Sequence, residues 1–339
     1  MNTKQLTKAE LEEAAQILQC GGLVGIPTET VYGLGANGLN PEAVEHIFQA
    51  KGRPQDNPLI LHIPTVAWLE RYCQEIPPTA YELAQAFWPG PLTMILKRKD
   101  CVPDVVTAGM ETVGMRCPSH PLCRQLLELA DVPVAAPSGN LSGRPSPTTA
   151  ADMWEDMDGK IDAILEGGSC SVGVESTIID LTCTPPRLLR PGGITLEQLQ
   201  KVLGEVAVDA AVTRQLQGGE KPKAPGMKYR HYAPKAPVIV VTGKPEETAA
   251  YILEHSTKQE GVLCFAEYEH LFPENQVRSI GSSGDKNQQA RRIFQALRAF
   301  DHTDVTQIWA QCPDTSGIGL AIANRLKKAA GFHVIDLTY

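Results

Sequence analysis

Cationic and hydroxyl-bearing side chains gather at predicted loop ends in the first part of this chain. The stretch KGRPQDNPLILH (51–62) places Lys51 and Arg53 on either side of a glycine at a helix end, with Asn57 and His62 after them. Arginine can hold phosphate oxygens through two parallel N–H groups, and lysine can add a point charge beside it. The alternative is that both cations only complement the helix dipole and that His62, in an apolar strand, belongs to the core.

Arg116 lies within a predicted strand, in ETVGMRCP (111–118). A buried arginine needs an anionic partner, which is either an internal carboxylate or a bound carboxylate or phosphate. The stretch IPTETVYGLGANG (26–38) follows another predicted strand. Its glycines allow a ligand close to the backbone, and Thr28 and Thr30 offer hydroxyls. The alternative is that these residues form only a glycine-rich strand and turn, with no ligand bound.

Two later stretches add hydroxyls and one more arginine. The loop APSGNLSGRPSPTT (136–149) contains Ser138 and Ser146, although turn chemistry explains much of its composition. Ser176 begins another predicted strand, and Arg190 precedes a turn. No Ser/His/Asp or Cys/His grouping with recognisable family spacing is present. These side chains suit a site that positions and neutralises a phosphate ligand, as phosphoryl and nucleotidyl transfer require, better than covalent catalysis.

The composition narrows the classes of function. A net charge of -8 over 339 residues argues against wholesale binding to nucleic acid or an anionic membrane, though not against a local site for a small anion. The nine cysteines include no C-x-x-C pair, which predicts free thiols in a reducing compartment and no zinc site. No stretch reaches the roughly 20 apolar residues of a membrane helix, and the amphipathic start is unlike a signal peptide. We therefore expect a cytoplasmic protein without membrane contact.

The elements that must position these residues are a mixture of strands and helices. Thr7 and Glu10 form a capping-box pattern, which predicts a helix as the first element, and a short buried strand is expected at 23–26. A second helix is predicted from Pro41 to about Lys51. Later strands sometimes alternate with helices and sometimes follow one another directly. This order favours a mixed sheet with helices packed on it.

The pattern changes in the last third of the chain. Residues 206–235 are poorly patterned and predict an interdomain linker. Beyond them, strand-like stretches alternate with helices, which predicts a smaller three-layer α/β domain with a mostly parallel sheet over 236–339. The turn SGIG (316–319) precedes one of these helices. It could bind an anion at the helix N-terminus, although such turns are more often structural.

Taken together, these stretches resemble the threonylcarbamoyl-AMP synthase family in its long two-domain form. The resemblance is carried by PTETVYGLG, KGRPQDNPL, APSGNLSG, VESTIIDL and LLRPG, in the family's order, and by PGMKYRHYAP (225–234). It implies an α/β protein with a YrdC-like domain over 1–205, whose twisted mixed sheet is flanked by helices. It also implies a linker over 206–235 that forms a lid on the active site, and a Rossmann-like α/β/α domain over 236–339.

The resemblance also implies an activity. Members of the family condense L-threonine, bicarbonate and ATP to threonylcarbamoyl-AMP and pyrophosphate, with Mg²⁺ expected on the triphosphate. The product is passed to a tRNA threonylcarbamoyl transferase, which modifies the adenosine beside the anticodon. A weak direct contact with tRNA is compatible with this function. No metal-ligating residue of the protein itself is implied.

The motif match implies ligand contacts and catalytic cations. The expected catalytic residues are Lys51 and Arg53. The expected contacts of L-threonine are Thr30, His62, Arg116, Ala136 and Ser176. The expected contacts of ATP are Arg53, Asn57, Thr112, Ser138, Ser146, Arg190 and Tyr229. Ala136 departs from the family, because relatives can carry a hydroxyl residue there, and Tyr229 would fold over the nucleotide unless the linker is only a rigid basic spacer.

Two other classes of function stay open on the sequence. A non-catalytic RNA-binding module could use the basic concave surface of a YrdC-like fold, but the acidic charge and the lack of interleaved aromatic residues count against it. A carbamoyl-transfer enzyme of the kind used in hydrogenase maturation would carry zinc-finger-like and acylphosphatase-like modules, which this sequence lacks. The sequence therefore favours the synthase.

Overall fold

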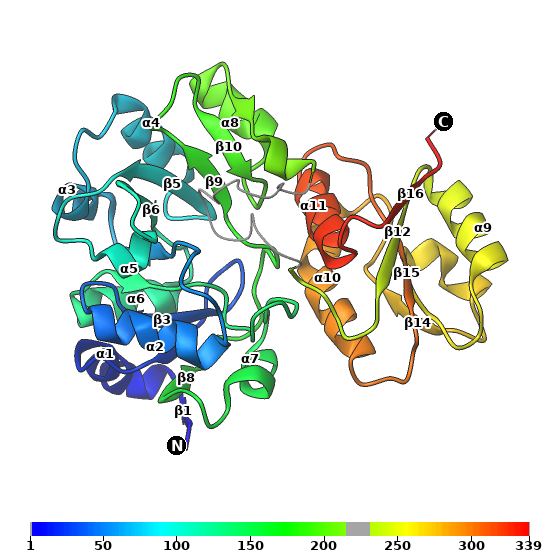
Figure 1. The fold of residues 1–339 in the computed structure, drawn as a ribbon, viewed down its shortest axis with the longest axis horizontal. Coiled ribbons are helices and arrows are strands. Elements are labelled where there is room, and N and C mark those ends of the chain that lie inside the picture. The colour runs from blue at the N-terminus through cyan, green and yellow to red at the C-terminus, as the bar shows by residue number, and fades with distance from the viewer. Residues whose placement is uncertain (1, 215–230, 339) are drawn as a thin grey trace. The chain divides into compact units, whose positions relative to one another are not determined.

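The computed structural model describes residues 2–214 and 231–338. These residues form two compact units, each with its own sheet (Figure 1). The first unit contains most of the chain before residue 215. The second contains the chain from residue 231 onward together with the short segments Gly143–Ser146 and Val172–Val174. Most of the predicted lid, including Tyr229, lies outside the described residues, so the lid stays a prediction.

An 11-stranded sheet forms the centre of the first unit. Its strands, in their order across the sheet, are β1 (Lys4–Leu6), β8 (Ala163–Leu165), β2 (Val24–Ile26), β3 (Gly33–Asn37), β7 (Val134–Ala135), β4 (Ile60–His62), β6 (Thr112–Arg116), β5 (Leu92–Lys97), β9 (Thr177–Asp180), β10 (Arg187–Arg190) and β11 (Ala207–Val208). Parallel and antiparallel pairs alternate irregularly: β4–β6 and β5–β9 are parallel, whereas β5–β6 and β9–β10 are antiparallel. The predicted mixed sheet is confirmed.

Helices pack on this sheet. They are α1 (Leu11–Gln19), α2 (Pro41–Lys51), α3 (Leu69–Tyr72), α4 (Pro78–Phe87), α5 (Asp104–Thr107), α6 (Pro121–Ala130), α7 (Ala150–Met157) and α8 (Leu196–Leu203), with 3₁₀ turns η1 (Lys8–Glu10), η2 (Val66–Trp68) and η3 (Ala210–Val212). The ends of α2 follow from its sequence. The Asn40 side chain accepts the N–H groups of Glu42 and Ala43, and Gly52 ends the helix with a left-handed φ of 60°.

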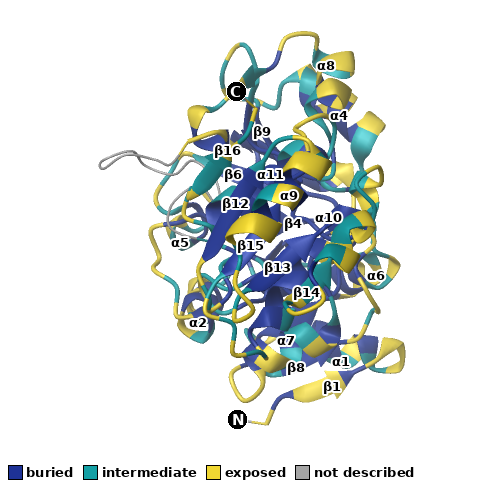
Figure 2. Ribbon diagram, turned by 90° about the vertical axis from the view of Figure 1, so that its right-hand side faces the viewer, coloured by how far each residue is buried: buried dark blue, intermediate teal, exposed yellow. Residues whose placement is uncertain are grey.

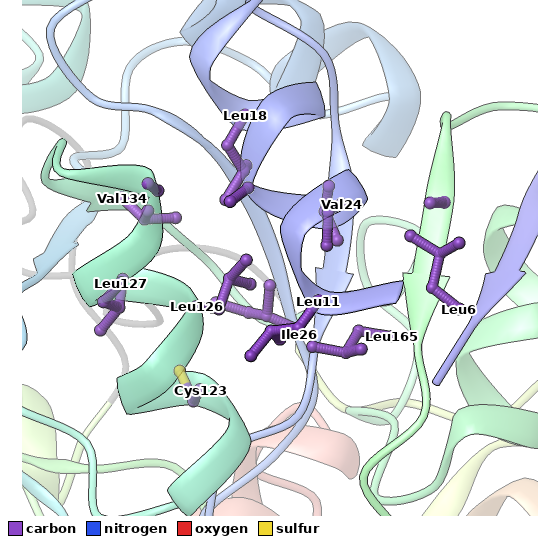
Figure 3. Close-up of a cluster of buried hydrophobic side chains, with 14 of the residues drawn as sticks. Leu6, Leu11, Leu18, Val24, Ile26, Cys123, Leu126, Leu127, Val134 and Leu165 are labelled. Carbon is purple, nitrogen blue, oxygen red and sulfur yellow. The ribbon is translucent and has the colours of Figure 1, made fainter. Parts of the chain in front are cut away.

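A hydrophobic cluster joins α1 and α6 to the strands at one end of this sheet (Figure 3). Leu11 and Leu18 of α1 and Leu126 of α6 are almost fully buried against Val24 and Ile26 of β2. The apolar positions of α1 recur at the spacing of one helix face, as the sequence predicts. This core fixes the end of β2, which leads into the 27–32 loop.

The second unit is a smaller parallel sheet with helices on both faces. Its strands, in order across the sheet, are β14 (Gln276–Ser279), β13 (Gly261–Cys264), β15 (Ile308–Gln311), β12 (Val238–Thr242) and β16 (Val334–Asp336). Its helices are α9 (Pro245–His255), η4 (Ala266–Leu271), α10 (Lys286–Phe300) and α11 (Gly319–Ala329). Figure 1 shows α9 on one side of this sheet and α10 and α11 on the other. All its strand pairs are parallel, which confirms the predicted α/β/α class.

The strand order of the second sheet has one particular feature. Strand β15 lies between β12 and β13, whereas in the dinucleotide-binding fold the first two strands of the chain are neighbours. The sheet is well covered: Val241, Val262 and Cys264 are fully buried and belong to one cluster with Phe272 and Trp309. Figure 2 shows the central strands of each sheet buried, the edge strand β1 largely exposed, and many exposed residues on the outer surfaces of the helices.

The structure corrects two expectations about short elements. The first element is the strand β1, which pairs with β8, and not a helix. The predicted linker region contains β11, which pairs with β10, and η3, whose Ala211 packs with Ile60 and Ile95 of the first unit. Strands of two or three residues are too short to give a periodic pattern, so the sequence does not reveal them. The position of the domain boundary stays a prediction.

All nine cysteines lie within the described ranges as free thiols, as predicted. None of the helices in these ranges has the length and apolar character needed to cross a bilayer.

Candidate active site

A row of polar side chains crosses consecutive strands on one face of the first sheet. His62 at the end of β4 is opposite Arg116 at the end of β6, and Arg116 is opposite Thr93 of β5. Ser176 immediately precedes β9, and Arg190 ends β10. Residues directly opposite each other on neighbouring strands project from the same face. Strand order thus gathers predicted site residues from segments that are far apart in the sequence.

Arg116 and Glu29 form a buried ion pair in this row. Arg116 Nη2 donates to Glu29 Oε1 at 2.8 Å, and each side chain is only 5% exposed. The other oxygen of Glu29 accepts the N–H of Ser119 at 3.1 Å. Arg116 Nε is buried, and it has no hydrogen-bond partner among the described residues. The guanidinium is therefore held by an internal carboxylate and keeps one buried donor for another acceptor.

Ser176 is the centre of a second hydrogen-bonded group. Its hydroxyl lies 2.7 Å from the Thr93 hydroxyl and accepts Arg190 Nη2 at 3.1 Å. Arg190 Nε also donates to the Ser176 carbonyl at 3.0 Å. All three side chains are buried. Arg190 thus brings a positive charge next to the hydroxyls of Ser176 and Thr93. Its two hydrogen bonds to Ser176 orient its guanidinium.

His62 is a neutral member of the row. Burial, and secondarily the charge of Arg116, lower the pKa of the His62 imidazole from 6.5 to about 3. Its Nδ1 lies 3.2 Å from the Ile60 carbonyl. Because the ring stays uncharged at neutral pH, it can supply a hydrogen bond and an apolar surface but no positive charge.

The 27–32 loop places hydroxyls beside Glu29. The Thr28 and Thr30 hydroxyls are 2.9 Å apart, and the Thr28 hydroxyl donates to the Val31 carbonyl at 2.6 Å. Thr30 is fully buried. Ala136, just after β7, is also buried. Its N–H donates to the Ile60 carbonyl at 3.0 Å, which leaves its methyl group and its carbonyl for contact with a ligand.

Lys51 anchors a loop. Its ammonium donates to the carbonyls of Ser138 and Asn140, both at 2.5 Å, and the residue is only 3% exposed. The Lys51 carbonyl accepts the N–H of Ser142 at 2.9 Å. The left-handed Gly52 ends α2 at this point, so the helix end and the 138–142 loop are fixed together. Lys51 does more than complement the dipole of α2, because its ammonium group is buried and donates hydrogen bonds to two carbonyl oxygens.

Three further predicted residues lie nearer the start of the central strands. Arg53 is half-buried; it donates to the Asn57 carbonyl at 3.3 Å and lies 5.9 Å from the centre of the Phe48 ring. Asn57 is buried, and its Oδ1 has no partner among the described residues. Thr112 begins β6, four residues before Arg116 and on the same face, at a distance along the strand of roughly 13 Å.

Two predicted site residues are not placed with this group. Ser146 is fully buried and belongs to Gly143–Ser146, which clusters with the second unit. Tyr229 lies outside the described residues. Within residues 2–214 and 231–338, no group of three or more His, Cys, Asp or Glu side chains could hold a metal ion.

Sequence reasoning missed two members of the site. Glu29 lies inside the PTETVYG stretch, between Thr28 and Thr30, and the need of a buried Arg116 for a carboxylate was the available signal. Thr93 gives no signal in the sequence, because a threonine in a strand is ordinary and only the β5–β6 register places it beside Arg116.

Comparison with known proteins identifies the family. A family model described as "Telomere recombination" matches residues 16–192, and one described as "Threonylcarbamoyl-AMP synthase, C-terminal domain" matches residues 194–331. A protein of Pyrococcus abyssi named threonylcarbamoyl-AMP synthase is 47% identical over 341 residues, which cover 98% of each chain. The chain belongs to the threonylcarbamoyl-AMP synthase family.

Other members of the threonylcarbamoyl-AMP synthase family match this chain over nearly its whole length, and one of them matches it in fold. The Bacillus subtilis protein of that name is 46% identical over 96% of this chain and 94% of its own length. The crystal structure of P. abyssi Sua5 complexed with L-threonine matches with a TM-score of 0.91 and 44% identity over 99% of this chain and 100% of that chain. The predicted family, fold class and enzymatic nature are confirmed, and catalysis is favoured over a non-catalytic RNA-binding module.

Proposed function

We propose that the chain condenses L-threonine, bicarbonate and ATP to threonylcarbamoyl-AMP. The threonine amine takes up CO₂ derived from bicarbonate and loses a proton, which gives a carbamate. A carbamate oxygen then attacks the α-phosphorus of ATP, and pyrophosphate leaves. No covalent bond to the protein is formed, so the protein holds the reactants in line, excludes water and neutralises charge.

The geometry of Arg116 is the observation that carries this proposal. Glu29 holds one side of its guanidinium, and the buried Nε donor without a partner among the described residues can take an oxygen of a substrate carboxylate. L-Threonine carries such a carboxylate, and the 44% identical P. abyssi protein was solved in complex with L-threonine. These two observations support L-threonine as the substrate of this chain.

The threonine subsite would be completed by the surrounding buried side chains. Thr30, Ser176 and neutral His62 offer hydrogen bonds to the amine, hydroxyl and carbamate of the substrate, and Ala136 offers a methyl contact. Threonine differs from serine by one methyl group, and burying a methyl group gives roughly 1–3 kcal/mol of discrimination. We therefore expect serine to be a poor substrate rather than an inactive one.

The nucleotide would lie along the same face of the sheet. Arg190 and Arg53 are the proposed partners of the phosphates, and Asn57, Ser138 and Thr112 are the proposed partners of the remaining nucleotide. Lys51 would act by holding the Ser138 carbonyl and by adding positive charge. Mg²⁺ would arrive on the triphosphate as part of the substrate. Ser146 and Tyr229 keep their ATP contacts as predictions from the sequence.

The product of this reaction needs a receiving enzyme. Threonylcarbamoyl-AMP is an activated acyl adenylate that hydrolyses in water, so a transferase must move its threonylcarbamoyl group onto tRNA. Weak direct contact between this chain and tRNA belongs to the same proposal. The free thiols support a reducing compartment, the cytoplasm, as its place of action.

A component-omission assay tests the proposal. Pyrophosphate release is followed with ATP, Mg²⁺, bicarbonate and L-threonine, and each component is left out in turn. We expect release to require both threonine and bicarbonate and to be weak with serine. Release that is indifferent to threonine would overturn the proposal, and no release from folded protein would favour the RNA-binding alternative.

Arg116 gives the matching variant test. Arg116→Gln should raise KM for L-threonine at least about tenfold, because a charge-assisted hydrogen bond to the substrate carboxylate is lost. Arg187→Gln is the matched control, because Arg187 lies on β10 of the same sheet with 42% of its side chain exposed. An unchanged KM in Arg116→Gln would contradict the proposed threonine contact.

A further inference from the structure

A cavity of about 340 Å³ opens in the first unit, outside the polar row. It lies where α4 and α6 meet the residues that follow β4 and β6. Val66 follows β4, Cys117 follows β6, Tyr81 and Trp88 come from α4 and its end, and Arg124 comes from α6. None of these five residues belongs to the predicted threonine or ATP contacts. The volume falls within the range of sites for small organic molecules.

The walls of this cavity are apolar and partly exposed. Val66 and Tyr81 are each 39% exposed, although they are large hydrophobic residues. The polar ends of the two aromatic residues point elsewhere: Trp88 Nε1 donates to the Leu92 carbonyl at 2.7 Å, and the Tyr81 hydroxyl donates to Glu70 at 3.2 Å. Their ring surfaces are thus left to face the cavity. Val66 and Tyr81 both line this cavity, so their exposed surfaces lie together and offer an apolar wall to a ligand.

Arg124 supplies the single charge of the cavity. Its Nε is buried and has no hydrogen-bond partner among the described residues. No ion pair of its guanidinium exists within the same ranges. No other residue lining the cavity is a lysine, arginine, aspartate or glutamate. Arg124 is half-buried, and it lacks the internal carboxylate that Glu29 provides for Arg116. A cationic group that is partly removed from water favours an anionic partner.

We propose that this cavity binds a small monocarboxylate with an apolar or aromatic body. The carboxylate pairs with Arg124, and the body lies against Trp88, Tyr81 and Val66. A carboxylate fits better than a phosphate, because one guanidinium balances one negative charge and a phosphate dianion needs further cationic donors. Cys117 directly follows Arg116, so the site lies next to the polar row but uses a different arginine.

Binding of simple acids tests this proposal without relying on catalysis. Benzoate, phenylacetate and cinnamate serve as probes, and phenylacetamide serves as the uncharged control. The indole N–H signals of the four tryptophans are recorded by NMR, and the Trp88 signal is assigned from its loss in Trp88→Phe. We expect at least one acid to shift the Trp88 signal and to leave the signal of Trp309, in the second unit, in place.

Variants of Arg124 decide the outcome. Arg124→Gln should weaken binding of the acid about tenfold or more, to the level of phenylacetamide, and Arg124→Lys should keep most of the affinity. Lys201→Gln, which removes an exposed charge from α8, should change nothing. The proposal is wrong if none of the three acids binds the folded protein, if Arg124→Gln binds as well as the unaltered chain, or if binding leaves the Trp88 signal unmoved.

Discussion

A single carboxylate decides how Arg116 can be used. Glu29 holds the guanidinium from one side while both side chains are almost fully buried. A buried ion pair contributes little net stability compared with apolar packing, but removing one partner leaves an uncompensated charge. The pair is therefore better explained by orientation than by stability. Glu29 is a positioning residue in the proposed reaction, because it acts through Arg116.

Glu29→Gln tests this positioning role. The amide keeps the shape of Glu29 but removes its charge, so Arg116 is no longer held firmly. We expect KM for L-threonine to rise about tenfold, with a smaller change in KM for ATP, and the free energy of unfolding to fall by about 3 kcal/mol. Pyrophosphate-release kinetics and urea unfolding measure the two effects. Glu12→Gln is the control, because Glu12 is an exposed residue of α1. A loss of stability without a rise in KM for L-threonine would contradict the positioning role of Glu29.

His62 shows how burial keeps a titratable group uncharged. Its pKa is lowered to about 3 in the folded state. Between pH about 6.5 and about 3 the imidazole is therefore protonated in the unfolded chain but stays neutral in the folded protein. Stability from this group is complete above pH about 6.5 and is lost progressively as the pH falls toward 3. The protein should therefore be acid-sensitive even though His62 never changes charge in the working range.

His62→Gln should reduce this acid sensitivity. Between about pH 7 and about pH 5, the His62 contribution to the free energy of unfolding should fall by about 2 kcal/mol in the unaltered chain and not in the variant. Urea unfolding of both proteins at the two pH values measures the difference, and other titrating groups cancel in the comparison. Equal pH dependence of the two proteins would show that His62 is not buried as a neutral group.

At the scale of elements, the end of α2 organises part of the site. The helix ends at Gly52 with a φ of 60°, which turns the chain so that Lys51 points to the 138–140 carbonyls while Arg53 lies beyond the turn. No atom lies within 4 Å of a Cβ added at Gly52. Glycine is favoured at position 52 because of the left-handed backbone conformation, and not because a side chain would collide with its neighbours.

Substitution of Gly52 separates these two causes. Gly52→Ala should lower the free energy of unfolding by about 1 kcal/mol, because an L-residue with a Cβ resists the left-handed conformation. Gly52→Asn should lower it by less, because asparagine tolerates this region. Chemical denaturation measures both variants. Equal stability of the Ala variant and the unaltered chain would contradict the conformational argument.

At the scale of the whole molecule, the chain has two separate cores. Leu18 and Leu126 belong to a cluster on the first sheet, and Phe272 and Trp309 belong to a cluster on the second. Each sheet has its own covering helices. A substitution that destabilises one core should therefore lower the stability of its own unit before that of the other.

Phe272→Ala tests the independence of the second core. Removal of this fully buried ring should destabilise its unit by about 3–5 kcal/mol. The four tryptophans can be labelled with fluorine and followed by NMR during thermal unfolding, with Trp309 assigned from Trp309→Phe. The Trp309 signal should change at a lower temperature than the other three. Simultaneous loss of all four signals would show that the chain unfolds as one cooperative unit.

Much of this protein is determined by local sequence. Asn40 and Gly52 mark the two ends of α2, because caps depend on neighbouring residues only. The regular alternation after residue 236 predicted the parallel sheet of the second unit, since parallel strands need helical connections. The family motifs indicated the threonylcarbamoyl-AMP synthase family and the proposed roles of Arg116 and Ser176. These signals are read without knowing which strands are neighbours.

The tertiary structure alone decided which residues meet. Strand order places β6 between β4 and β5, and β5 next to β9, so that Thr93 lies beside Ser176. The same folding gives Arg116 the partner Glu29 and leaves Arg124 without one among the described residues. Contacts between distant segments depend on sheet order and register, which short patterns in the sequence do not encode. For this reason the sequence indicated the chemistry, and the structure determined the arrangement that can perform it.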